Sequence, residues 1–328
     1  MAFTAEEIRR SLAALGEMPI TGLQILSAQA LAVQYYPHLD AGQPVLILGL
    51  SERSQATRLQ QTLLQVYPAD HAVTLAHDGD TTVLPLGELA ERADCLPGTI
   101  LLIPPLAQPA SYEALQDIIV HLRSPEGCPW DRELTWARLR GSLLEETYEL
   151  LAALDTENAA KVREELGDLL LQIGLQAEIA TEEGLFRFGD VIAGIVTKLI
   201  RRHPHVFGDA VVTGTADVLA NWEAIKAAER RNNGEKRSPL AGIPPGLPAL
   251  AQADAYLDRM SRLQEQKAPA APWAALAKLP SDAPVSTELL GEVLFGLVAW
   301  ARARGLDAES ALRAANARFA ATVEAQLT

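Results

Sequence analysis

Five carboxylates lie in two stretches of the chain that are otherwise rich in leucine. The first stretch, residues 143–151, reads LLEETYELL, and the second, residues 163–180, reads REELGDLLLQIGLQAEIA. The acids are Glu145, Glu146, Glu149, Glu165 and Asp168. No lysine or arginine occurs from residue 141 to 160. Because packed carboxylates repel each other, and because their burial is unfavourable unless a cation or a proton compensates, the chemistry to consider first is cation binding.

Helical spacing places the acids of each stretch on one face. Glu145 and Glu146 precede Glu149 by four and three residues, so all three fall within an arc of roughly 100° in helical projection. Glu165 and Asp168 are three residues apart, and their stripe continues through Gln172, Leu175 and Ile179. The second stretch is apolar nearly all the way round, which is typical of a helix inside a bundle. We therefore expect its acids to face neighbouring helices.

Three interpretations of the acids differ in what neutralises them. An acidic face in solvent usually carries Lys or Arg at helical spacing, and these cations are missing here. A di-iron carboxylate site needs Glu-x-x-His pairs, and no His stands three residues after any of the five acids. A hard divalent cation held by oxygen atoms alone fits the set, so Mg²⁺, or alternatively Mn²⁺, is the expected cofactor.

Two basic residues and one tryptophan further along the chain suit a phosphorylated ligand. Lys198 and Arg202 are four apart on a helix that Pro204 must end. The helix dipole by itself favours basic residues at this end, so an ordinary helix terminus explains the pair as well as a clamp on phosphate oxygens does. Trp222 is suited either to stacking on a base or to packing in the core, and its context leaves both open.

The elements that must position these residues are of two kinds. Apolar runs at residues 44–50, 72–76 and 99–103 are bounded by turn residues and predict buried strands. Helical patterns near 22–34 and 52–66 complete an α/β domain, which we predict over residues 1–108.

The rest of the chain is predicted to be helical. Residues 109–231 form an all-α domain, and residues 232–248, polar and then rich in Pro and Gly, form a linker. Residues 249–328 form a helical tail domain. The predicted fold class is therefore multidomain, with a small α/β domain, an all-α bundle and a helical tail.

Composition and charge limit the partners. The 328 residues carry a net charge of −14, which argues against a broad basic surface for nucleic acid. No run reaches 18 apolar residues, so we expect no membrane partner and a cytoplasmic protein. Cys95 and Cys128 lack the spacing of a zinc site or a disulfide framework. There is no GxxxxGK[ST] loop, so a P-loop ATPase is unsupported.

Five blocks in residues 111–231 resemble, in order, the MazG nucleoside triphosphate pyrophosphohydrolases: CPWDRE, LLEETYELLAAL, EELGDLLLQI, KLIRRHPHVFG and NWEAIKAAER. The resemblance implies an all-α bundle that forms homodimers, uses Mg²⁺ and cleaves nucleoside triphosphates between the α and β phosphates. The products are a monophosphate and pyrophosphate, a reaction that serves nucleotide-pool house-cleaning.

The resemblance also assigns residues. It implies that the metal ligands are Glu146, Glu149, Glu165 and Asp168. It also implies that Lys198, Arg202 and Trp222 bind the substrate. From the mechanism of metal-assisted hydrolysis, we expect Glu145 or Glu146 to accept a proton from the attacking water as the catalytic base. The chain departs from the family pattern at Leu134, where the family usually has Gln, and at Trp136 and Gln176, where it usually has His, so base selectivity stays open.

The two ends of the chain resemble other parts of longer family members. Residues 288–297 echo residues 164–173, as in a degraded second MazG repeat, with Leu289 at the place of Glu165 and Glu292 at that of Asp168. Its first acidic helix is replaced by APAAPWAALAKLPSD, so we expect packing or dimerisation there and no metal site. The N-terminal domain resembles a lobe of tetrapyrrole-methylase-like domains without the Gly-rich half.

The expected function is therefore an enzyme, a Mg²⁺-dependent hydrolase of standard or non-standard nucleoside triphosphates. The alternative is a regulatory or assembly module that binds Mg-nucleotide without turnover. Five complete acids favour the enzyme, because a pure binder need not keep them all.

Overall fold

The computed structural model of the chain describes residues 22–78, 80–92, 98–108, 110–232, 240, 242–262 and 286–327. The chain divides into two compact units. The first is Met1–Leu151 with Asn158–Asp190, and the second is Ala152–Glu157 with Val191–Thr328. Cys95, the segment 268–282 and part of the predicted linker lie outside the described residues. The predicted domain boundaries themselves stay predictions.

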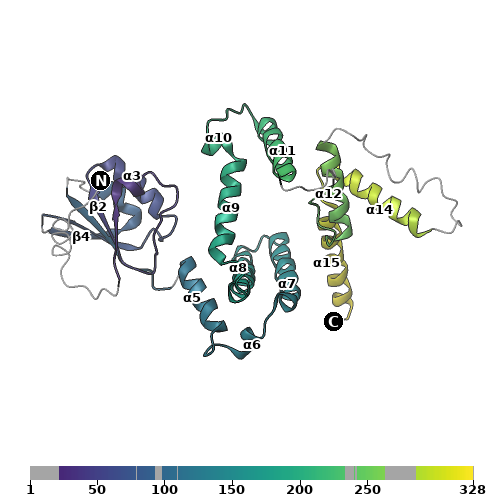
Figure 1. Ribbon diagram of the computed structural model, residues 1–328, viewed down its shortest axis with the longest axis horizontal. Coiled ribbons are helices and arrows are strands. Elements are labelled where there is room, and N and C mark those ends of the chain that lie inside the picture. Colours follow the sequence, from purple (N-terminus) through teal and green to yellow (C-terminus); the bar gives the residue numbers. More distant parts are fainter. Residues whose placement is uncertain are drawn as a thin grey trace. The chain divides into compact units, whose positions relative to one another are not determined.

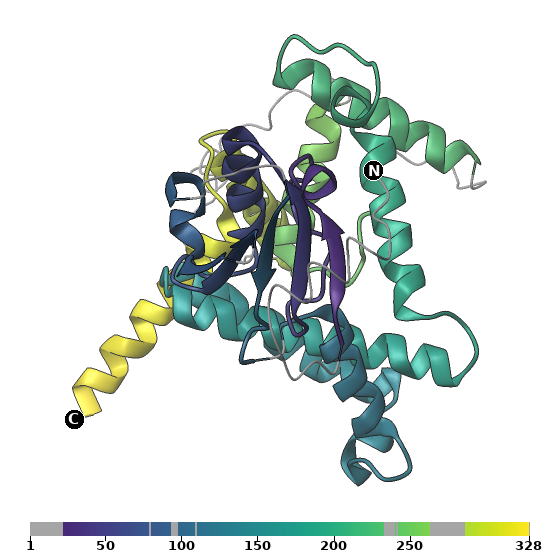
Figure 2. The same cartoon turned by 90° about the vertical axis from the view of Figure 1, so that its left-hand side faces the viewer.

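The described chain begins with an α/β region whose strands form one mixed sheet, seen with its strands side by side in Figure 2. The strands are β1 (Gln24–Ser27), β2 (Val45–Leu50), β3 (Ala72–His77), β4 (Asp80–Pro85) and β5 (Thr99–Ile103). Their order is β1-β2-β5-β3-β4, with β1 and β2 parallel and the other pairs antiparallel. Two short helical segments, η1 (Leu86–Glu88) and α4 (Leu89–Arg92), follow β4. The three predicted strands are confirmed as β2, β3 and β5.

Two elements of this region differ from the prediction. The helix expected near 22–34 is wrong for its first half, because residues 24–27 pair with β2 and only α2 (Ala28–Leu31) is helical. Ladder hydrogen bonds to a buried strand override the local helical pattern here. β4 was not predicted, because it is largely exposed and shows no apolar run.

Alternation along the strands builds a core on both faces of the sheet. Val45 and Ile47 of β2 belong to the larger cluster, together with Leu59 and Leu63 of α3 (Arg53–Leu63). Leu46 belongs to a smaller cluster of buried residues with Leu48, Ile100 and Leu102. The helix predicted near 52–66 is thus confirmed as α3, whose apolar side packs on the sheet.

Helices follow, as predicted for this part of the chain. They are α5 (Tyr112–Arg123), α6 (Pro129–Arg132), α7 (Trp136–Asp155) and α8 (Ala159–Glu182). The side chain of Asn158 caps α8 by accepting a hydrogen bond from the backbone N–H of Lys161 (3.2 Å). A Cβ at Gly174 would overlap the side chain of Ile119, so glycine lets α8 approach α5 closely. Ile119 packs there with Leu139, Leu175 and Ile179.

Every regular element that the structure describes in the second unit is a helix. Its helices are the larger part of α9 (Phe188–Arg202), with α10 (Pro204–Phe207), α11 (Thr215–Asn232), α12 (Ala249–Arg262), α14 (Thr287–Arg302) and α15 (Ala308–Leu327). α12, α14 and α15 pack together, and Arg302 of α14 pairs with Asp254 and Asp258 of α12. Among the described residues, no helix combines the length and apolar character needed to cross a membrane.

Candidate metal centre

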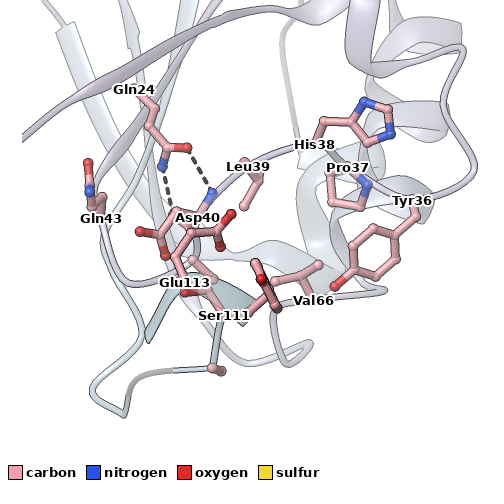
Figure 3. Close-up of a pocket in the computed structure, with 13 residues that line it drawn as sticks. Gln24, Tyr36, Pro37, His38, Leu39, Asp40, Gln43, Val66, Ser111 and Glu113 are labelled. Carbon is pink, nitrogen blue, oxygen red and sulfur yellow. Dashed lines mark hydrogen bonds between the residues drawn. The ribbon is translucent and has the colours of Figure 1, made fainter. Parts of the chain in front are cut away.

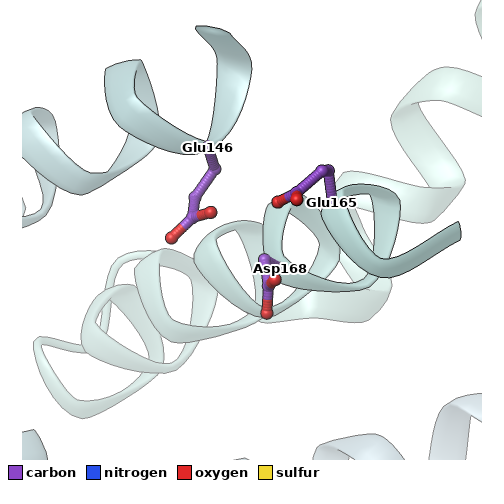
Figure 4. Close-up of side chains that lie close together, drawn as sticks. All are labelled: Glu146, Glu165 and Asp168. Atoms are coloured by element: carbon purple, nitrogen blue, oxygen red, sulfur yellow. The ribbon is translucent and has the colours of Figure 1, made fainter. Parts of the chain in front are cut away.

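Three of the five acids meet between α7 and α8. Figure 4 shows Glu146 reaching from α7 towards Glu165 and Asp168 on α8. One carboxylate oxygen from each of these residues lies within 4.8 Å of the others. The prediction that acids from two helices converge is therefore confirmed for these three.

The stripe along α8 is buried as its spacing predicts. Glu165 is only 4% exposed, Asp168 is half-buried, and Gln172 is 7% exposed. The stripe then continues into the apolar core at Leu175 and Ile179. The acids thus sit where water is partly excluded, which strengthens their interaction with any cation.

The first helix presents its acids differently. Glu146 is half-buried, whereas Glu145 and Glu149 are exposed and contribute no atom to the group of three. Burial raises the pKa of Glu146, and the negative charges of nearby acids raise it further, those of Asp168 and Glu149 most strongly. Glu149 therefore lies close enough to affect Glu146 without joining the cluster.

The prediction that α8 lacks a neutralising cation is wrong. Lys161 lies four residues before Glu165, with its Nζ 3.5 Å from Glu165 Oε1 and 3.1 Å from Glu164 Oε2. The i, i+4 spacing was visible in the sequence and is the signal that the reasoning missed. One exposed ammonium offsets only part of the charge of three converging carboxylates, so the cluster retains a net negative charge.

The donor set fits a hard divalent cation. Carboxylate oxygens are the ligands that such ions prefer, and three of them converge at one point. The buried Oε1 of Gln172, on the same stripe, has no hydrogen-bond partner among the described residues. Sequence reasoning placed Gln172 on this face without assigning it a role.

The predicted phosphate-binding residues belong to the second unit. Arg202 donates from Nε and Nη2 to the two carboxylate oxygens of Glu229, at 3.2 and 2.6 Å, and Arg201 contacts the same carboxylate at 2.6 Å. The hydrogen bonds from Arg202 lower the pKa of Glu229. Lys198 is exposed, and no carboxylate in the described part of the chain lies within ion-pair distance. Glu229 is a partner that the sequence reasoning did not identify.

Trp222 is half-buried beside these residues. The guanidinium carbon of Arg202 lies 5.3 Å from the centre of its ring, and the ring of His203 meets it edge-on at 5.0 Å. This is the geometry of a cation–π contact and an aromatic pair. Trp222 therefore has packing partners of its own, and part of it stays accessible.

Two of the positions that depart from the family pattern, Trp136 and Gln176, contact each other. Nε1 of Trp136 donates a hydrogen bond to the backbone carbonyl of Gln176, at 3.0 Å. Trp136 also stacks near Phe186, with 6.5 Å between ring centres. Both contacts lie within the first unit.

A separate cavity of about 630 Å³ lies in the first unit, as Figure 3 shows. It is lined by Asp40, Glu113, His38 and Tyr36 among others, and none of the three clustered acids reaches it.

Comparison with known proteins agrees with this geometry. A family model described as the MazG nucleotide pyrophosphohydrolase domain matches residues 135–207. A nucleoside triphosphate pyrophosphohydrolase of Escherichia coli K12 is 40% identical over 221 residues, which cover 63% of this chain and 83% of that protein. The nucleoside triphosphate pyrophosphohydrolase/pyrophosphatase MazG of Thermotoga maritima is 41% identical over 216 residues, which cover 63% and 82%.

Two further matches differ in extent. The uncharacterised protein YabN of Bacillus subtilis is 38% identical over 244 residues, 72% of this chain, and the chain spans about half (49%) of its length. The crystal structure of a mazG-related protein from Thermotoga maritima is 26% identical and covers 35% of this chain, with a TM-score of 0.31 that is too low to bear on the fold. The tetrapyrrole-methylase resemblance of residues 1–108 stays a prediction. The acids converging between α7 and α8, and the long matches to named relatives, confirm the resemblance seen in the sequence: the chain belongs to the MazG nucleotide pyrophosphohydrolase family.

Proposed function

We propose that this chain hydrolyses nucleoside triphosphates, or their deoxy and non-standard forms, to nucleoside monophosphate and pyrophosphate with Mg²⁺. The convergence of Glu146, Glu165 and Asp168 within 4.8 Å is the observation that carries the proposal. The names of the relatives from Escherichia coli and Thermotoga maritima support the same reaction.

In this proposal the carboxylates of Glu146, Glu165 and Asp168 would hold the cation. When bound, the cation neutralises triphosphate charge and makes a bound water more acidic. Glu146 would accept a proton from the attacking water, because its carboxylate lies at the point where the acids converge. The water oxygen bonds to the α phosphorus, and the bond from that phosphorus to the α–β bridging oxygen breaks. Pyrophosphate leaves with the bridging oxygen.

Glu145 and Glu149 have separate places in the proposal. Glu149 is retained as a fourth ligand, which requires its exposed side chain to turn towards the cluster when the cation binds. Glu145 is exposed and has no contact with the three clustered oxygens, so Glu146 is the preferred base of the two.

The basic residues of α9 are proposed to bind the leaving phosphates. Lys198 offers its whole ammonium group, because no carboxylate among the described residues pairs with it. Arg202 is held by Glu229 through Nε and Nη2, which leaves Nη1 for a phosphate oxygen. The accessible part of Trp222 is proposed to stack on the base.

We also propose that the chain forms a homodimer in the cytoplasm. α8 exposes Leu166, Leu170 and Ile173, which stand four and three residues apart and form one apolar stripe. Exposed apolar stripes of this kind mark association surfaces. Replacing Leu170 with Lys should shift the sedimentation coefficient of the purified protein from that of a dimer to that of a monomer. An unchanged coefficient would place the interface elsewhere.

Product analysis tests the proposed reaction. The purified chain is incubated with each nucleoside and deoxynucleoside triphosphate and Mg²⁺, and the products are separated by ion-exchange chromatography. Monophosphate and pyrophosphate in equal amounts are expected. Diphosphate with inorganic phosphate would contradict cleavage between the α and β phosphates, and tight binding without product would favour the regulatory module instead. Glu149→Gln in the same assay tests the fourth ligand, because retained turnover would remove Glu149 from the site.

A further inference from the structure

One buried polar group beside the acidic cluster has no use in the proposed reaction. The side chain of Gln172 is 7% exposed, and its Oε1 is fully buried with no hydrogen-bond partner among the described residues. A buried carbonyl without a donor is unfavourable, because it loses its bonds to water and gains none in return.

Among the described residues, the side-chain oxygen of Gln116 also lacks a hydrogen-bond partner, but it differs from that of Gln172 in one respect. Gln116 of α5 also has a buried Oε1 without a partner, but its Nε2 donates to Glu178 at 2.9 Å. The amide of Gln116 is therefore explained by Glu178. No contact within the described residues explains the amide of Gln172.

The position of Gln172 relates it to the acids. It follows Asp168 by four residues and Glu165 by seven, so the three side chains share one face of α8. Side chains four apart on a helix have Cβ atoms about 5–6 Å apart, which puts the amide one turn beyond the cluster. On its other side the stripe becomes apolar at Leu175.

The repeat in the second unit supports the same relation. Residues 288–297 echo residues 164–173, and Leu289 and Glu292 replace Glu165 and Asp168. The position of Gln172 is occupied there by Gly296. Where leucine replaces the first acid of the pair, glycine replaces the glutamine.

We propose that Gln172 belongs to the cation site, with its Oε1 serving as a further oxygen for the bound divalent cation or for one of the waters on that cation. Amide oxygens are suitable partners for hard cations and for their waters. This inference rests on the proposed function, since it needs the cation held by Glu165 and Asp168. It gives the buried carbonyl of Gln172 a partner.

Cation binding without nucleotide tests the inference. Mn²⁺ is titrated into the full-length chain, and free Mn²⁺ is measured by electron paramagnetic resonance. Gln172→Leu should weaken Mn²⁺ binding by about tenfold, as the loss of supporting groups around metal sites commonly does. Its melting temperature without cation should stay equal or rise, because an orphaned carbonyl has been removed. Gln172→Glu should instead tighten Mn²⁺ binding and lower the cation-free melting temperature.

Controls separate this inference from the proposed function. Gln176→Leu, one turn on, should leave Mn²⁺ affinity unchanged. If the unaltered chain binds no Mn²⁺, or if Asp168→Asn binds it equally well, the cation site itself is wrong. If the unaltered chain binds Mn²⁺ through Asp168 but Gln172→Leu stays within twofold of it, only the role of Gln172 is overturned. The role of Gln172 at the cation is also overturned if Gln172→Leu raises the KM for nucleotide and leaves the Mn²⁺ affinity unchanged, because Gln172 would then contact the substrate. Should Gln172→Leu fail to fold, Gln172→Glu and Gln172→Asn decide by the same titration.

Discussion

α8 and α14 share a sequence pattern, since residues 288–297 echo residues 164–173, and they differ more in a few polar positions than in how the two helices begin and end. Each begins with a side-chain cap, where Asn158 accepts from the N–H of Lys161 and Ser286 accepts from that of Leu289. Each is followed by a glycine with positive φ, 71° at Gly184 and 70° at Gly305. That conformation favours glycine and lets the chain close the helix with bonds back to its last turn.

Their outer surfaces match as well. α8 exposes three apolar residues, Leu166 (52% exposed), Leu170 (46%) and Ile173 (44%). At the equivalent positions α14 exposes Leu290 (51%), Leu294 (43%) and Leu297 (38%). The difference lies on another face, where Glu165, Asp168 and Gln172 become Leu289, Glu292 and Gly296. The comparison shows that apolar pattern and caps maintain the helix, while a few polar positions decide whether it can hold a cation.

The strongest test of this comparison removes one equivalent acid from each helix. Asp168→Asn should lower kcat for triphosphate hydrolysis by at least about 100-fold, because charge stabilisation in the transition state depends on it. Glu292→Gln should leave kcat unchanged. Both are measured by pyrophosphate release at saturating Mg²⁺. Equal losses in the two variants would mean that α14 shares in catalysis.

Restoring the acids to α14 tests whether they suffice. The double variant Leu289→Glu with Glu292→Asp is expected to gain no Mn²⁺ site, because the acids of the neighbouring helix α12, Asp254 and Asp258, already pair with Arg302. The free energy of unfolding should fall by about 1 kcal/mol, as a half-buried leucine is replaced by a charge. Urea unfolding and Mn²⁺ titration check the two expectations. A second equivalent of bound Mn²⁺ would break the distinction between the helices.

A smaller effect is expected from removing the positively charged side chain of Lys161 on α8. Lys161→Met removes the ammonium 3.5 Å from Glu165, so the cluster should bind Mg²⁺ more tightly, by about two- to fivefold for such an exposed ion pair. Isothermal titration without nucleotide measures this. Weaker Mg²⁺ binding by Lys161→Met would mean that Lys161 organises the site and does not compete with Mg²⁺ for Glu165. Arg163→Met on the same helix serves as the control.

The smallest expected effect is on the pH dependence of stability. Because the pKa of Glu146 is raised in the folded protein, the folded state holds this proton at a pH where the unfolded state has released it. Stability without cation is therefore lost as pH rises from the ordinary glutamate pKa through the raised one. Glu146→Gln should remove this slope, seen as a flatter curve of melting temperature against pH. Equal slopes in the two proteins would show that neither burial nor the neighbouring acids raise the pKa of Glu146.

Much of this arrangement could be predicted, because it depends on local pattern. Three strands, the run of helices after Ser111 and the buried stripe of α8 follow from short-range periodicity. β1 could not be predicted, because its strand form comes from pairing with β2 and its own residues read as a helix. Lys161 could have been found from its spacing, whereas the pairing of Arg202 with Glu229, 27 residues on, could not.

The sequence by itself determined the family, the acids and the face of each helix on which they stand, because a helix fixes the direction of its side chains at every residue. Only the tertiary structure decided that Glu146 joins Glu165 and Asp168 while Glu145 and Glu149 remain exposed. It also decided that the amide oxygen of Gln172 is buried without a donor. Distances between helices depend on how their apolar faces pack, and no periodicity within one helix contains that information.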